Sequence, residues 1–435
     1  MKIYSQLIKT FIIIASLLGT ATMHAQSWEQ IQKLPTAQNI FVAPNGNLIS
    51  SDFQYIDYSG GIYYSTDKGD SWIKCNVADH AYCKMIQAGE YIIAAGEGCN
   101  LARSKDNGAT WEVLNYAYMF TDYISEDDLI YDVAYAIAYF KEKLFVADFG
   151  GGGVIYSEDF GETWTLTDRE SLKYDLGQIK STAKDDNKGI DSFYNLAENN
   201  GELLLFGVYF IYRLNEADYT WELLRNDCNF MGVSATVDDK LICGRAIMNY
   251  NEASPYLEYT SDGGRSWGHI AHADTVDFDT NVRVLHSDEK GLYSGMQSGV
   301  IYYTNDLGQN WTNISDGLPI SLSPLIIDSD DEYLYVAIYD TPWSSSTASG
   351  IYRYKKSELP VASVNTTLND NDNVYVHNNI LYVESEANIN LYNASGAKVA
   401  AIENSNTLNI ASLPHGIYIY EITTATSRIT GKIAK

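Results

Sequence analysis

The chain is poor in proline and in basic residues, and each shortage excludes a class of protein. Its 435 residues include 8 Pro against 32 Gly and 35 Tyr, which suits short strands and tight turns rather than disorder. The 29 Lys and Arg face 56 Asp and Glu, a formal net charge of −27. This charge repels phosphate backbones, so no nucleic-acid partner is expected, and it keeps an exported protein soluble.

Long apolar runs are also missing, so no transmembrane span is expected. The N-terminus instead has the pattern of a signal peptide: a basic start at Lys2 and Lys9, a short apolar run over residues 11–18, and Ala25 before the expected cleavage. We expect residues 1–25 to be removed and the mature protein to be secreted or displayed on the cell surface.

Cysteine is scarce, and its spacing excludes a Cys/His metal site. Export permits disulfides, and Cys228 and Cys243, which flank one expected hairpin, are the candidate pair. Cys75, Cys83 and Cys99 could form one more bridge. The alternative is that all five are small buried apolar residues. GxSxG, HExxH and P-loop motifs are absent as well, and we expect no metal and no cofactor.

One phrase, Ser/Thr-x-Asp-x-Gly-x-x-Trp, occurs five times, at residues 65–72, 104–111, 157–164, 260–267 and 304–311. Its Asp can accept backbone N–H groups within the turn, its Gly permits positive φ, and its Trp can fix the hairpin to a neighbour. We therefore interpret these residues as structural: Asp67, Gly69, Trp72, Asp106, Gly108, Trp111, Asp159, Gly161, Trp164, Asp262, Gly264, Trp267, Asp306, Gly308 and Trp311.

The spacing of the phrase predicts the number of repeats. A gap of about two repeats contains a degenerate copy without glycine at residues 211–221, and a seventh repeat without the phrase follows over residues 325–354. That repeat offers three strands, and the segment 27–31 resembles the missing fourth. The prediction is an all-β chain with one seven-bladed propeller of four-stranded antiparallel blades over residues 26–357; six or eight blades are the alternatives.

The phrase resembles the Asp-box, or BNR repeat, of sialidase-like and sortilin-like β-propellers. The resemblance implies that the box turns are scaffold. It also implies that ligands bind at the opposite face, formed by the loops between strands two and three and by those between blades.

After an expected linker at residues 358–373, residues 374–435 have a different sequence pattern from the repeats. They contain Leu391-Tyr392-Asn393-Ala394-Ser395-Gly396, Leu413-Pro414-His415-Gly416-Ile417-Tyr418 and the final Gly431-Lys432-Ile433-Ala434-Lys435. These pieces resemble the type A C-terminal sorting domain of the type IX secretion system of Bacteroidota. The resemblance implies a small β-sandwich, handling by that secretion machinery, and later release or attachment to surface lipopolysaccharide. The alternative is an ordinary sandwich that binds glycan or packs on the propeller.

Candidate ligand contacts lie in the loops of the expected working face, where aromatic rings can stack on sugars. They are Tyr55, Tyr58, Tyr118, Tyr123, Arg245, Tyr250 and Trp343. Three carboxylates there, Asp52, Asp148 and Asp340, are catalytic candidates. Glycoside hydrolysis would require two of them at about 5 Å or about 6.5–9.5 Å.

Sialidase chemistry, as the resemblance implies it, needs three converging arginines, but Arg169, Arg225, Arg245 and Arg283 are scattered, and no Arg-Ile-Pro tripeptide occurs. Residues 328–332 could hold calcium, although a solvated hairpin turn is the expected structure. The predicted function is binding of an extracellular glycan or protein. A secreted glycoside hydrolase or lyase is the alternative, and a photosystem-type assembly factor is a third reading that the sorting domain disfavours.

Overall fold

A computed structural model of the chain divides into two compact units, Met1–Leu359 and Pro360–Lys435. The structure describes residues 27–33, 37–54, 59–77, 82–96, 100–115, 136–148, 153–173, 192–208, 210–226, 230–245, 257–270, 282–319, 322–339, 348–360, 374–377, 380–393, 397–410, 413, 417–424 and 428–434. The expected signal peptide and most of the expected linker lie outside these residues.

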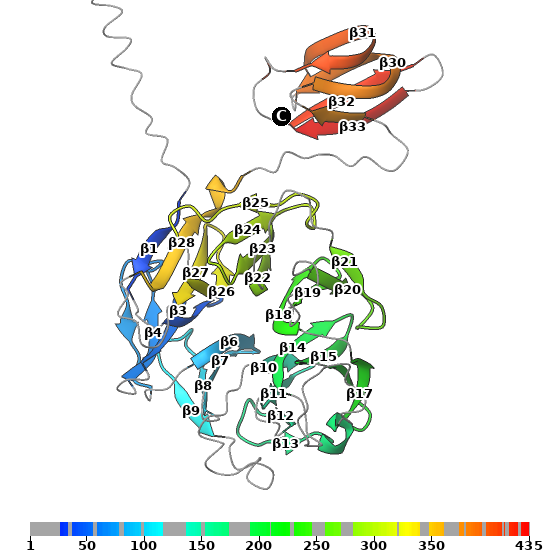
Figure 1. Ribbon diagram of the computed structural model, residues 1–435. Coiled ribbons are helices and arrows are strands. Elements are labelled where there is room, and N and C mark those ends of the chain that lie inside the picture. The colour runs from blue at the N-terminus through cyan, green and yellow to red at the C-terminus, as the bar shows by residue number, and fades with distance from the viewer. Residues whose placement is uncertain are drawn as a thin grey trace, which may run out of the picture. The chain divides into compact units, whose positions relative to one another are not determined.

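The first unit contains seven four-stranded antiparallel sheets, arranged as blades around one axis (Figure 1). Blade one has β2 (Ala37–Val42), β3 (Leu48–Gln54), β4 (Ser59–Ser65) and β5 (Ile73–Lys74); blade two has β6 (Tyr82–Ala88), β7 (Tyr91–Gly96), β8 (Asn100–Ser104) and β9 (Glu112–Asn115). Blade three has β10 (Ala136–Phe140), β11 (Lys143–Ala147), β12 (Val154–Ser157) and β13 (Thr165–Leu166), followed by the 3-10 helix η2 (Arg169–Leu172).

The remaining blades repeat this order. Blade four has β14 (Phe193–Asn199), β15 (Glu202–Gly207), β16 (Ile211–Asn215) and β17 (Thr220–Arg225); blade five has β18 (Phe230–Val237), β19 (Lys240–Arg245), β20 (Leu257–Thr260) and β21 (Gly268–Ile270). Blade six has β22 (Val282–Asp288), β23 (Gly291–Met296), β24 (Ile301–Thr304) and β25 (Thr312–Asn313). Blade seven has β26 (Ser323–Ser329), β27 (Tyr333–Tyr339), β28 (Gly350–Lys355) and β1 (Glu29–Gln32), with η4 (Lys356–Glu358) ending the unit.

The N-terminal strand closes the ring, as the sequence predicts. Glu29 and Gln30 of β1 pair with Arg353 and Tyr352 of β28. Trp28 is 4% exposed, and its indole Nε1 donates to the Ile314 carbonyl of blade six at 2.7 Å. The other end of the chain thus supplies the fourth, outer strand of blade seven and pairs the outer edge of β28.

Each blade buries both of its faces. Its strands therefore contain continuous apolar runs, whereas a sheet with one exposed face would alternate apolar and polar residues. Within Leu203-Leu204-Leu205-Phe206 of β15, the residues at 203 and 205 belong to the core shared with blade three. Those at 204 and 206 belong to the core shared with blade five. The period of two is still present, but both sets are apolar because neighbouring blades cover both faces.

The five repeated turns share one hydrogen-bond pattern. In the first, the Gly69 amide donates to Ser65 Oγ at 2.9 Å, the Ser71 amide to Asp67 Oδ1 at 2.9 Å, and the Trp72 indole to the Gly69 carbonyl at 3.0 Å. The corresponding amides of the other four turns donate to their own Asp and Ser or Thr in the same way. The carboxylate thus organises the turn.

The turn glycine also joins each blade to the one before it. Gly108 has φ +89°, and a Cβ built there would lie 2.3 Å from Ile49 Cδ1 of blade one. The turn tryptophans follow the same rule, since Trp111, Trp164 and Trp311 lie in cores shared with the preceding blade. The turn therefore acts as a joint between blades.

The degenerate copy builds its turn differently, as its missing glycine predicts. Among its residues only Tyr219 has a positive φ, and the Thr220 amide donates to Asp218 Oδ1 at 3.2 Å. The preceding blade supports this turn, because the Asp168 amide donates to the Tyr219 carbonyl and the Trp221 amide to Ser171 Oγ, both at 2.9 Å.

The second unit has five strands, β29 (Val374–His377), β30 (Ile380–Asn393), β31 (Lys398–Asn409), β32 (Ile417–Thr423) and β33 (Arg428–Ala434). Residues 380–393 form one long strand, β30, rather than two short ones. Register shifts at Ala387 and Ile389 explain this, because a bulge lets one strand continue while its pairing changes. β30 pairs with β29, β31 and β32, around a core of its own that includes Leu391 and Tyr420.

Candidate functional site

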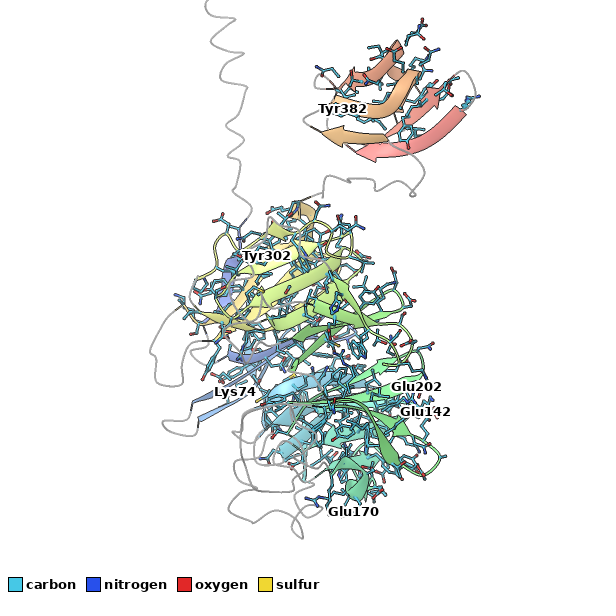
Figure 2. All side chains as sticks on the ribbon, turned by 45° about the vertical axis from the view of Figure 1, so that its right-hand side comes forward. Lys74, Glu142, Glu170, Glu202, Tyr302 and Tyr382 are labelled. Carbon is cyan, nitrogen blue, oxygen red and sulfur yellow. The ribbon has the colours of Figure 1, made fainter. Side chains whose placement is uncertain are left out.

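The two ends of the ring differ in the length of their connections. At the end with the repeated turns, strands one and two of five blades are joined by two-residue turns, such as Gly89-Glu90 and Lys141-Glu142. At the opposite end, the strands that flank residues 116–135, 246–256, 271–281 and 340–349 end and begin. We call these the box end and the loop end. In Figure 2 the labelled Glu142 and Glu202, both beside box-end hairpins, lie on the same side of the ring.

The box end is held together by ion pairs between blades. Arg265 of the repeated turn in blade five contacts Glu202 of blade four at 2.6 Å. Lys68 of the first turn contacts Asp330 and Glu332 of blade seven at 3.2 and 3.1 Å, and Arg353 contacts Glu29 and Asp70 at 3.0 Å. These ion pairs therefore join box-end segments of neighbouring blades.

Six of the seven inner strands carry a register shift near their first residues, at the loop end; β10 pairs with β11 without one. In blade six the shift lies between Val282 and Val284, which pack toward blades five and seven respectively. Arg283 between them is the extra residue of the bulge.

The other bulges place an extra residue at the equivalent position, and we call the set the axial ring. Its members in single-residue bulges are Gln38, Cys83, Tyr194, Arg283 and Leu325. In blade five the bulge covers residues 231–233, where a Cβ built on Gly232 would lie 2.2 Å from Tyr194 Cβ of blade four. Neighbouring bulges therefore touch.

Most of the predicted ligand contacts lie outside the described residues: Tyr55, Tyr58, Tyr118, Tyr123, Tyr250, Trp343 and the carboxylate Asp340. Arg245 is the last residue of β19, at the loop end. These assignments stay predictions.

The two described catalytic candidates are buried at the loop end of second strands. Asp52 in β3 is 5% exposed, and Asp148, just after β11, is 1% exposed. They belong to blades one and three, so blade two separates their strands. The third candidate lies outside the described residues, so the pairing of these carboxylates stays a prediction.

The four arginines considered for a substrate carboxylate come from four different elements: η2, β17, β19 and β22. Arg225 Nη1 lies 2.9 Å from Glu258 Oε2 of blade five, and its guanidinium lies over the Trp267 ring at 5.3 Å. Arg169 lies in η2 after blade three, and Arg283 is in the axial ring of blade six. Each has a separate place in the fold.

Of the expected disulfide, Cys228 lies outside the described residues, while Cys243 in β19 is 1% exposed. The Cys75 thiol is buried and donates to the Gly108 carbonyl at 3.2 Å. This fits the alternative of small buried apolar residues for Cys75.

Sequence reasoning missed a buried polar cluster at the box end between blades six and seven. Lys356 Nζ lies 2.8 Å from Asp288 Oδ2 and donates to the Asp330 carbonyl at 2.7 Å. Ser329 Oγ donates to Asp288 Oδ2 at 2.9 Å and lies 2.9 Å from His286 Nε2. Burial opposes ionisation of Asp288, but hydrogen bonds from Lys356, the Lys290 amide and Ser329 outweigh it and lower its pKa.

This cluster contains Ser, His and Asp but lacks the order of a catalytic triad. There the imidazole lies between the hydroxyl and the carboxylate, whereas here Ser329 lies between His286 and Asp288. Burial lowers the pKa of His286 to about 4, so the ring is neutral at pH 7. A serine whose proton points to a carboxylate already paired with lysine is not activated, so the cluster fixes blade seven to blade six.

The run 328–332 is a hairpin turn, as expected. Asp330 Oδ1 accepts the amides of Glu332 and Tyr333, each at 2.7 Å, which uses the carboxylate inside the turn. Throughout the described part of the chain, no three His, Cys, Asp or Glu side chains come together as metal ligands. Nor does any helix among the described residues have the length and apolarity needed to cross a membrane.

Comparison with known proteins identifies the C-terminal unit and the fold. Residues 370–435 match the secretion system C-terminal sorting domain. No curated protein matches the sequence. Among solved structures, YCF48 from Cyanidioschyzon merolae superposes with a TM-score of 0.52 at 14% identity, over 77% of this chain and 99% of that one. A structure of YCF48 bound to D1 peptide gives 0.51 at 15% identity, over 76% and 98%.

These identities show the fold alone. The chain is thus a seven-bladed β-propeller followed by a secretion-system C-terminal sorting domain, and that domain marks it for export by the type IX system.

Proposed function

We propose that the exported ring is a binding protein that holds an extracellular glycan or protein at its loop end. The observation that carries this proposal is the asymmetry of the ring: short, ion-paired turns at one end and all the long connections at the other. Long connections on a rigid ring are where propeller surfaces vary and bind. The aromatic candidates Tyr118, Tyr123, Tyr250 and Trp343 are in those connections.

Export supports the same reading, because a protein marked by the sorting domain meets its ligands outside the cell. YCF48, a propeller of similar architecture, has a structure with a peptide bound. That precedent supports the idea that such a ring can hold a polypeptide.

The test is binding of the full-length mature chain to a glycan array and to immobilised extracellular proteins. Trp343→Ala and Tyr118→Ala should each weaken binding about tenfold or more, since loss of an aromatic anchor typically costs ≥ ~1–2 kcal/mol. Ile73→Ser, on the outer strand of blade one, is the control, because this side chain is exposed and away from the loop end.

The hydrolase alternative is tested in parallel on released polysaccharides. Release of sugar by the wild type that disappears in Asp148→Asn would contradict the proposal and favour an enzyme. Unchanged binding in both aromatic variants would instead move the binding surface away from the loop end.

A further inference from the structure

The chain leaves the propeller through a short segment that is packed into the ring. After β28 come η4 and Leu359, the last residue of the first unit, and Pro360 begins the second unit. We call Lys356–Leu359 the exit segment. Lys356 is only 5% exposed and Leu359 8%. The base of the connection to the sorting domain is therefore folded as part of the ring.

Polar contacts of Lys356 anchor the start of the exit segment. Its amide donates to the Glu332 carbonyl at 2.8 Å and its Nζ to the Asp330 carbonyl at 2.7 Å, both in the turn between β26 and β27 of blade seven. Nζ also lies 2.8 Å from Asp288 Oδ2 of blade six. Because a buried lysine is costly without its partners, these contacts hold the segment while blades six and seven stay together.

The end of the exit segment packs against the tryptophan directly before the closing strand β1. Leu359 lies in one core with Trp28 and Tyr354. The ring of Tyr354 lies 5.4 Å from that of Trp28, and its hydroxyl donates to the Glu358 carbonyl at 3.1 Å. Trp28 is held in turn by blade six, since its amide donates to the Asp316 carbonyl at 2.9 Å. Opening of β1 would therefore remove part of the core that holds Leu359.

We propose that the exit segment is a latch that keeps the base of the sorting-domain connection folded only while β1 closes the ring. Trp28 and Leu359 share one core, so release of either should loosen the other. In an open ring the latch becomes a site for proteases, which act on locally opened states. A cut there separates the ring from its sorting domain. The latch thereby makes retention of the export signal depend on completion of the fold.

Trypsin is a specific probe of the latch. The sequence contains no Lys or Arg between Lys356 and Lys398, so fragments 356–435 and 357–435 arise only by cleavage after Lys355 or Lys356. The test follows release of these fragments from the full-length mature chain by mass spectrometry. We expect slow release from the wild type, and release about tenfold faster or more from Trp28→Ala, because the latch opens more often.

Asp288→Asn tests the other anchor, because it leaves Trp28 and both trypsin sites in place. It removes the charge opposite the buried Lys356, so fragment release should become about threefold faster or more. Ile73→Ala, at an exposed position on the outer strand of blade one, is the control and should behave as the wild type. Cleavage after Arg265 in blade five is followed in the same digest as a measure of general unfolding.

Hydrogen exchange measures the coupling in the opposite direction. Leu359→Ala should raise exchange of the β1 amides about tenfold or more, because coupling between two sites is reciprocal. Unchanged exchange of β1 would overturn the inference, as would fragment release from Trp28→Ala at the wild-type rate. A rise in release that cleavage after Arg265 matches would also overturn it, since the whole ring would then be opening. None of these outcomes depends on ligand binding at the loop end.

Discussion

At the scale of single residues, the repeated turn explains why one phrase could recur through blades that are otherwise unlike. Asp supplies the acceptors that order the turn, and Gly supplies both a left-handed backbone and the space for an aliphatic side chain of the preceding blade. Each residue therefore acts within its turn and across a blade boundary.

The two parts of the glycine's role can be separated by a matched pair of substitutions. Gly46 and Gly108 have similar φ values, +85° and +89°, but a Cβ on Gly46 meets nothing within 4 Å, whereas on Gly108 it lies 2.3 Å from Ile49. Gly46→Ala should lower the free energy of unfolding by about 1 kcal/mol from backbone strain, and Gly108→Ala by a further ~1–3 kcal/mol from overpacking. Equal losses in guanidinium unfolding would show that the contact with Ile49 is unimportant.

The turn carboxylates predict a loss of stability in acid. Hydrogen bonds from Ser266 lower the pKa of Asp262 to about 2, and those from Ser71 do the same for Asp67. A depressed pKa in the fold gives stability that is present above about pH 4 and is lost as the pH falls toward 2. The free energy of unfolding, measured by urea at several pH values, should therefore fall over this range. Asp262→Asn should flatten that slope, whereas Asp331→Asn on an exposed hairpin should leave it unchanged.

At the scale of elements, β1 closes the ring, because it joins the N-terminal end of the chain to the last blade. β1 is only four residues long. Trp28, directly before it, packs in the core of blades six and seven and so helps to hold the strand in place. Trp28→Ala should lower the free energy of unfolding by about 3–5 kcal/mol, the range for truncating a buried aromatic residue. Ile73→Ala on the exposed outer strand of blade one should cost well under ~1 kcal/mol. A similar midpoint of unfolding for both variants would contradict the role of β1 in closure.

The seam between blades seven and one contains a carboxyl group that works against the fold at neutral pH. Asp328 Oδ2 accepts the Val42 amide at 2.7 Å, while burial raises the pKa of Asp328 to about 6. A raised pKa of an acid favours its protonated form in the fold, so stability is lost as the pH rises from about 4 through 6. Asp328→Asn removes the charge and keeps one of the two acceptors, since Asp328 Oδ1 also accepts the Ser329 amide at 2.8 Å.

Relative to the wild type, this variant should gain about 1–2 kcal/mol of stability between pH 4 and pH 8, because only the wild type acquires a buried charge over that range. The measurement is urea unfolding at the two pH values. A difference of the same size at both would assign the effect to packing rather than to charge.

At the scale of the whole molecule, folding and export belong to separate parts of the chain. The ring closes on itself within residues up to Leu359, and the sorting domain has its own core. A chain without residues 370–435 should fold normally but remain inside the outer membrane. Cell fractionation with immunodetection would show it in the periplasm, while Gly46→Ala in the full chain should still be exported. Normal export of the truncated chain would contradict the function of the sorting domain.

The sequence by itself predicted seven blades, the closing strand and the sorting domain, and the seven sheets and the family match confirm them. These predictions depend on local signals: a turn phrase with a regular spacing, a strand-like segment at residues 27–31, and short motifs at the C-terminus. The degenerate turn was found for the same reason, since its Trp221 and its position in the repeat remained even without glycine.

Only the tertiary structure decided what surrounds the axis and what holds the last blade. The bulge at Arg283 depends on the packing of Val282 and Val284 against two different blades. The cluster of Lys356, Asp288 and Ser329 joins residues from three separate strands or turns. Sequence reasoning listed Arg283 only as one of four scattered arginines, because contacts between blades have no pattern along the chain. A period can be read locally, but which side chains meet across a ring is fixed only when the ring closes.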